Sequence, residues 1–164
     1  MSKEDTKDLQ KFMEPFSDNI RSTALWLRAF VWDLYPDCNE LIYDNYNALA
    51  FGWSPTDRLG HTFCSIAVME RYLHFGFYWG SQIADPGKKL VGNGKQYRYI
   101  KISDRKDFPV AYIKKLLKEA YANSLAKVKD ESQITTGQTI VKSISPVRKR
   151  PGIVTAKKKK SKHT

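Results

Sequence analysis

The stretch TFCSIAVMERYLHFGFYW, residues 62–79, carries the clearest strand signal in this sequence. It contains two short runs rich in Val, Ile, Phe and Tyr, at residues 62–69 and 72–79, and these residue types favour strands. Only Glu70 and Arg71 separate the runs, so they are predicted to form a hairpin with a tight turn. Similar runs at residues 41–46, 48–53 and 97–102 predict an antiparallel sheet of about five strands.

Two amphipathic helices flank these strands. Residues 19–34 carry apolar side chains at spacings of three and four, after Ser17 and Asp18 as helix-capping residues. A second helix is expected over residues 110–121, capped by Asp107. Its apolar residues share one face, opposite Lys114, Lys115 and Lys118. The sequence therefore predicts an α+β fold in which N-terminal and C-terminal helices pack on the sheet.

The 164 residues favour one domain, because 41% of them are apolar and a chain of this length can bury a core. Apolar periodicity stops after Asp130, where Ser, Thr, Gly, Pro, Lys and Arg dominate. Such a segment has too little apolar surface to offset the entropy of ordering. The predicted division is a domain at residues 1–131 and a disordered basic tail at residues 132–164.

The net charge of +11 is divided into blocks along the chain. Residues 1–87 carry 7 basic and 12 acidic groups, a net charge of −5. Residues 88–129 carry 12 basic and 3 acidic groups, a net charge of +9, and residues 132–164 carry 9 basic groups and no acidic ones. The body of the domain thus pairs an acidic first part with a basic second part.

The two cysteines, Cys38 and Cys64, lie at no metal-ligand spacing and in no CxxC pair. The first residues show no export signal, and no apolar run approaches the roughly 20 residues that span a bilayer. These observations predict a cytoplasmic protein without a membrane span.

Residues 12–121 resemble the YdhG-like domain family, whose function is unknown and whose members are mostly bacterial. The resemblance rests on LWLRAFVWDLYPDCNELIYDNYNALAFGWSPTDR at residues 25–58, FCSIAV at residues 63–68 and LHFGFYWGSQIADPGKKLVGNGKQYRYIKI at residues 73–102. It implies a small α+β fold with helices against an antiparallel sheet. Some members are described as frataxin-like iron chaperones, so the resemblance also implies iron delivery as an alternative function. The basic tail departs from the simplest members of the family.

The glycine-rich segment before the fifth strand is a candidate anion site, because glycine lets backbone N–H groups approach a ligand closely. It lacks the Ser or Thr of a nucleotide-binding P-loop, so nucleotide hydrolysis is not predicted. An alternative is that the glycines only turn the chain while the lysines stay solvated. The candidate residues are Lys88, Lys89, Gly92, Gly94, Lys95, Arg98 and Lys101.

Two other features suggest nucleic-acid contacts. Aromatic residues at 74–79 beside the basic strand at 97–99 could stack on bases, although alternating aromatics more often pack in a core. The tail would be attracted to nucleic acid through non-specific, salt-sensitive contacts. Its candidate residues are Arg148, Lys149, Arg150, Lys157, Lys158, Lys159 and Lys160.

No recognisable nucleophile, base and orienting acid occur together, so an enzyme is not predicted. The main hypothesis is a non-enzymatic binding domain for an anionic ligand, with no cofactor and with a tail that adds non-specific nucleic-acid affinity. A second hypothesis is an iron chaperone, and a third is an accessory domain that binds another protein. Hard oxygen ligands suit iron, and the acidic candidates are Asp33, Asp37, Glu40 and Asp44.

Overall fold

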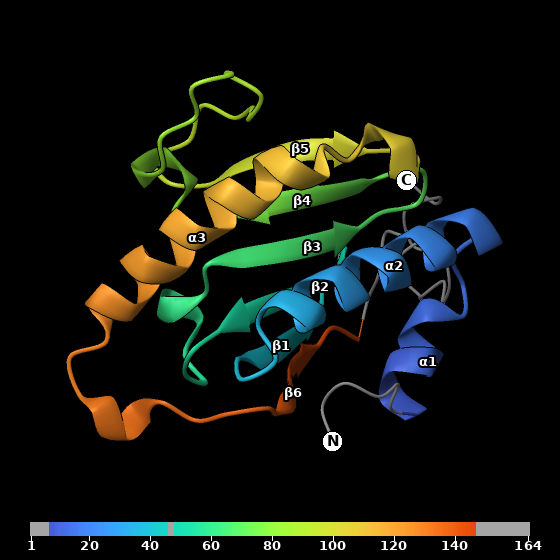
Figure 1. Cartoon of the computed structure of the whole chain (residues 1–164). Helices are drawn as coiled ribbons and strands as arrows, with labels where there is room; N and C mark the ends of the chain where they lie inside the picture. Colours follow the sequence, from blue (N-terminus) through green and yellow to red (C-terminus); the bar gives the residue numbers. More distant parts are fainter. Residues whose placement is uncertain (1–6, 46–47, 147–164) are drawn as a thin grey trace, which may run out of the picture.

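The computed structural model describes residues 7–45 and 48–146, in which α2 and α3 cross one face of a sheet (Figure 1). The helices of this part are α1 (Lys7–Met13), α2 (Asp18–Leu34) and α3 (Val110–Lys127). Its strands hydrogen-bond in the order β5-β4-β3-β2-β1-β6. Their bounds are β1 (Asn39–Asp44), β2 (Leu49–Ser54), β3 (Cys64–Val68), β4 (Leu73–Phe77), β5 (Arg98–Ile102) and β6 (Thr139–Ile144). The predicted α+β class is confirmed.

The hairpin predicted at residues 62–79 forms from β3 and β4. Met69 N donates to Tyr72 O at 3.0 Å and closes the two-residue turn. The strands β1, β2, β3, β4 and β5 pair with one another in chain order, each antiparallel to the next. All five predicted strands are therefore present, with bounds that shift by no more than two residues.

Alternation along these strands separates two faces of the sheet. On β3, Cys64, Ile66 and Val68 are completely buried, whereas Ser65 and Ala67 between them are only half-buried. The buried set belongs to the core shared with the helices. Because successive side chains of a strand point to opposite faces, Ser65 and Ala67 lie on the face opposite α2 and α3. We call this the outer face.

The sixth strand corrects the prediction of a five-stranded antiparallel sheet. β6 pairs with β1 in parallel, with Glu40 opposite Thr139 and Asp44 opposite Ile144. The prediction that disorder begins at residue 132 is therefore wrong for residues 139–144. Parallel partners need a long connection rather than a tight turn, and here β2, β3, β4, β5 and α3 all lie between β1 and β6 in the chain. The sheet is mixed, and the tail residues from 147 onward lie outside the described part.

Asn39 anchors the segment that leads into β6. Its side chain is completely buried, and Nδ2 donates to Thr135 O at 3.1 Å and to Thr56 O at 3.3 Å. Its Oδ1 accepts from Gln138 N at 3.2 Å. A buried amide with this many partners fixes the path of the chain before β6, because each bond would be costly to leave unmade.

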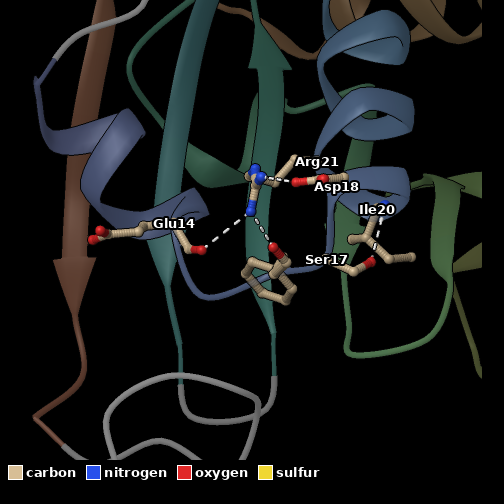
Figure 2. Close-up of polar contacts among 6 residues, drawn as sticks. Glu14, Ser17, Asp18, Ile20 and Arg21 are labelled. Atoms are coloured by element: carbon tan, nitrogen blue, oxygen red, sulfur yellow. Dashed lines mark hydrogen bonds and ion pairs between the residues drawn. The ribbon is translucent and has the colours of Figure 1, made fainter.

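The two long helices begin differently. Ser17 caps α2 as predicted, since its Oγ accepts from Ile20 N at 3.3 Å (Figure 2). The prediction that Asp107 caps α3 is wrong. Asp107 Oδ2 instead accepts from Ser103 N and Asp104 N, both at 2.9 Å, and closes a short 3-10 turn ahead of the helix. The residue that precedes α3 is Pro109, so no side chain there caps the first N–H groups.

A polar network around His61 closes the loop between β2 and β3. Thr56 Oγ1 lies 2.8 Å from His61 Nδ1 and accepts from Arg58 N at 3.1 Å. The threonine is completely buried. Because Thr56 Oγ1 already accepts a hydrogen bond, its own proton is available to a neutral His61 Nδ1.

This arrangement predicts a loss of stability at mildly acidic pH. Burial and the charge of Arg58 lower the pKa of His61 from 6.5, so the folded chain binds this proton more weakly than the unfolded chain does. Burial and Lys101 lower the pKa of His74 in the same direction. Stability should therefore be full above the unfolded pKa and fall as the pH drops below it.

The measurement is urea unfolding at about pH 7.5 and about pH 5.5. His61→Asn keeps an acceptor near Thr56 without titrating, so its stability should fall less between the two pH values. A variant whose pH dependence equals that of the unchanged chain would contradict the role given to His61.

Candidate anion-binding surface

The loop between β4 and β5, residues 78–97, lies along α3 (Figure 1). Hydrogen bonds tie the loop to the helix along its length. Gly87 N donates to Tyr112 Oη at 2.9 Å, Ala84 N donates to Glu119 Oε1 at 3.1 Å, and Lys127 Nζ donates to Gln82 Oε1 at 2.8 Å. These contacts hold the loop that carries Lys88 and Lys89 beside α3, which carries Lys114, Lys115 and Lys118.

Asp85 organises the turn at the tip of this loop. Its carboxylate accepts from Lys89 N at 3.0 Å, from Leu90 N at 2.9 Å and from the hydroxyl of Tyr112. Burial alone would raise the pKa of Asp85, but these hydrogen bonds and the Lys89 charge together lower it. The backbone N–H groups of the turn therefore already hold a carboxylate, and an external anion would depend on the lysine side chains.

The other acidic residues of the basic region also bind backbone N–H groups rather than lysines. Glu119 accepts from Ala84 N, and Asp104 Oδ1 accepts from Lys106 N at 3.1 Å. Asp107 closes its own 3-10 turn. Among the described residues, none of these carboxylates forms an ion pair with a surrounding cation.

We call these cations the basic face. All of its members are exposed, and they come from the loop tip, from the turn before α3 and from the first half of α3. Within the described residues, none forms an ion pair; the ion pairs found there are Arg21–Asp18 and Arg28–Glu40. The basic face consists of Lys88, Lys89, Arg105, Lys106, Lys114, Lys115 and Lys118.

The structure divides the seven predicted anion-site residues among three places. Lys88 and Lys89 belong to the basic face. Arg98 Nη1 donates to Gly94 O at 2.7 Å and to Tyr97 O at 2.8 Å, so this guanidinium holds the returning loop. The remaining loop residues are Gly92, which has a φ of 125°, Gly94 and Lys95. Lys101 lies on the outer face, 4.5 Å above the Tyr72 ring.

Sequence reasoning did not place the α3 lysines in the site. An amphipathic helix explains Lys114, Lys115 and Lys118 completely as its solvated side, so they carried no separate signal. The signal that could have found them is the block of net charge +9 over residues 88–129, which the fold gathers around one helix.

The outer face carries a ladder of stacked rings from β4, β5 and the residue that precedes each of them. The ring centroids of His74 and Tyr99 are 3.9 Å apart, those of Tyr72 and His74 are 5.4 Å apart, and those of Tyr97 and Tyr99 are 5.7 Å apart. All three pairs are stacked. The rings that were expected to receive bases therefore have neighbours on their faces.

Gly76 leaves the space that the Tyr97 ring of this ladder occupies. A methyl group at Gly76 would overlap the ring and hydroxyl of Tyr97, so Gly76→Ala should displace that ring. We expect the variant to lose about 1–3 kcal/mol in the free energy of unfolding, as overpacked positions do. Gly94→Ala is the matched control, because nothing lies within 4 Å of the added methyl. Thermal unfolding measures both, and equal melting temperatures would contradict the close packing of Tyr97 on Gly76.

A groove of about 660 Å³ between α1 and α2 is a weaker candidate. Its floor is nearly closed, since Leu9 and Met13 are only 1% and 3% exposed. Arg21 on its rim donates to Glu14 O at 3.2 Å and to Phe16 O (Figure 2). These bonds fasten the turn between the two helices, so Arg21 already has hydrogen-bond partners within the chain. The lining residues are Leu9, Gln10, Lys11, Met13, Glu14, Arg21 and Leu25.

The acidic iron candidates occupy different environments. Glu40 and Asp44 are completely buried, whereas Asp33 and Asp37 are exposed. Arg28 Nε and Nη2 donate to the Glu40 carboxylate at 2.6 and 2.9 Å. No group of three or more His, Cys, Asp or Glu side chains suited to a metal occurs in residues 7–45 and 48–146. Iron binding stays a prediction, which anaerobic titration with ferrous iron would test.

No family model, curated protein or solved structure matches this chain. The resemblance to the YdhG-like domain therefore stays a prediction from the sequence. In the described part of the chain, no helix is both long and apolar enough to cross a bilayer.

Proposed function

We propose that this chain is a non-enzymatic binding domain for phosphate-bearing polyanions, with the basic face as its contact surface. The observation that carries the proposal is the set of seven exposed cations around the first half of α3, none of which forms an ion pair in the part of the chain that the structure describes. Such a surface attracts phosphates and releases their counterions on binding. The start of α3 adds a favourable field, because helix N-termini favour anions and Pro109 supplies no side-chain cap.

The tail is a second, independent source of positive charge. Its seven candidate residues lie beyond residue 146, outside the described part. In this proposal the tail adds loose affinity and the basic face sets where the polyanion lies on the domain. The two contributions can be separated, because each can be neutralised without touching the other.

The test is fluorescence anisotropy with a short labelled nucleic acid at about 50 and about 200 mM salt. Replacing Lys114, Lys115 and Lys118 by Gln in the full chain should weaken binding about tenfold or more at the lower salt. It should also reduce the slope of log K against log salt by about 2–3. The matched control replaces Lys11, Arg58 and Arg71 by Gln, which removes the same charge from other exposed positions.

The control triple should change the affinity by less than about threefold, because its residues lie outside the basic face. Equal losses in the two triples would mean that net charge alone governs binding. Binding that disappears only when the seven tail residues become Gln would assign it to the tail. Either result would overturn the proposal.

A further inference from the structure

Rings in the basic region are already occupied by its own cations. Lys89 Nζ lies 5.5 Å from the centroid of the Tyr112 ring, and Lys127 Nζ lies 4.8 Å from that of Trp79. The Arg105 guanidinium lies 5.5 Å from the Trp26 ring and also donates to Ser22 Oγ at 2.9 Å. Each of these cations can still bind a phosphate while it stays on its ring.

The outer-face ladder is closed to bases for a similar reason. His74 has Tyr72 on one side and Tyr99 on the other, and Lys101 covers Tyr72 at 4.5 Å. Proteins that bind single strands rely on free ring faces, each worth about 1–3 kcal/mol per stacked base. A base could stack here only by displacing a ring or a cation that is already in contact.

The chemistry of the basic face points the same way. Six of its seven members are lysines, which bind as flexible point charges. Reading guanine edges favours the planar fork of arginine, but Arg98 holds its own loop and Arg105 is engaged with Trp26 and Ser22. The face is thus suited to phosphates and poorly suited to base edges.

We infer that the basic face binds the phosphate backbone of double-stranded nucleic acid, without stacking on bases or reading their sequence. This inference rests on the proposed function and narrows it to one ligand class. A duplex offers a denser row of phosphates than a single strand, with a salt slope of about 0.9 rather than about 0.7 per contact. Binding to the phosphates of a duplex also requires no contact with the aromatic rings.

The experiment uses the full-length chain with the seven tail residues replaced by Gln, so that the basic face dominates binding. The probes are a short duplex, each of its single strands, a second duplex of unrelated sequence, long-chain inorganic polyphosphate and vesicles containing an anionic phospholipid. We expect the duplexes to bind within about twofold of each other and at least about threefold more tightly than the single strands. Tyr72→Leu should leave duplex affinity within about twofold, since its ring is not used.

Tighter binding of a single strand, or a loss of duplex affinity in Tyr72→Leu, would overturn the inference. Binding to polyphosphate or to vesicles but not to the duplex would also overturn the inference. If polyphosphate binds, the proposed function would still hold. Failure of every probe would instead remove the proposed function itself. The two failures are therefore distinguishable.

Discussion

Ending the chain at Glu131 is expected to lower the free energy of unfolding by about 4 kcal/mol. The cut removes β6 and takes hydrogen-bond partners away from two buried side chains of β1. Asn39 loses Thr135 and Gln138, and Glu40 loses the hydroxyl of Thr139, which donates to its Oε1 at 2.9 Å. Asn39 Oδ1 would lose Gln138 N, and a buried polar group left unpaired costs about 1–3 kcal/mol; the lost pairing of β6 with β1 accounts for the rest.

A second truncation, which ends the chain at Pro146, is the matched control. It keeps β6 and every contact named above, so its melting temperature should stay within about 2 °C of the full chain. The shorter chain should melt about 10 °C lower, at about 2–4 °C for each kcal/mol. If calorimetry shows the two truncated chains melting together, β6 does not belong to the sheet in solution.

Glu40→Ala is expected to cost about 3–5 kcal/mol, because it leaves a buried guanidinium without its counter-charge. The ion pair with Arg28 is bidentate, and the two side chains are 4% and 0% exposed. It joins α2 to β1, and through Thr139 it also reaches β6. Urea unfolding of the variant and of the unchanged chain gives the difference directly.

Two further variants are the controls for this prediction. Asp37→Ala removes an exposed carboxylate close by in the sequence and should change stability by no more than about 0.5 kcal/mol. Combining Arg28→Met with Glu40→Leu replaces both charges by apolar groups, and it should recover part of the loss because no unpaired charge remains. A double variant less stable than Glu40→Ala would contradict this account of the pair.

The hairpins and the two long helices could be predicted because their signals are local. The run at residues 62–79 contains both strands and the turn between them, and the period of α2 is visible within its own 17 residues. β6 could not be predicted in the same way. Its sequence, TIVKSI, lies in a polar stretch, and its partner β1 lies about a hundred positions earlier in the chain. A parallel pair leaves no turn signal.

The candidate site, too, could be predicted only where its signal is local in the sequence. The sequence indicated Lys88 and Lys89 through the glycines and the charge near them. It could not show that Arg98 donates hydrogen bonds to the carbonyl oxygens of Gly94 and Tyr97. Nor could it show that the Asp85 carboxylate accepts from the backbone N–H groups of the turn. Those facts depend on how the loop folds back, which composition does not encode. The sequence thus shows how much charge each segment carries, but the fold determines which charged side chains remain available to a ligand.

An NMR titration of the full chain with a short duplex would locate the polyanion on the domain, because backbone amide shifts report contacts residue by residue. We expect the largest shifts at residues 85–90 and 104–118, which contain the basic face. The outer-face amides of Tyr72, His74 and Tyr99 should change little. Shifts confined to residues 147–164, or concentrated on the outer face, would contradict the claim that the basic face is the binding surface.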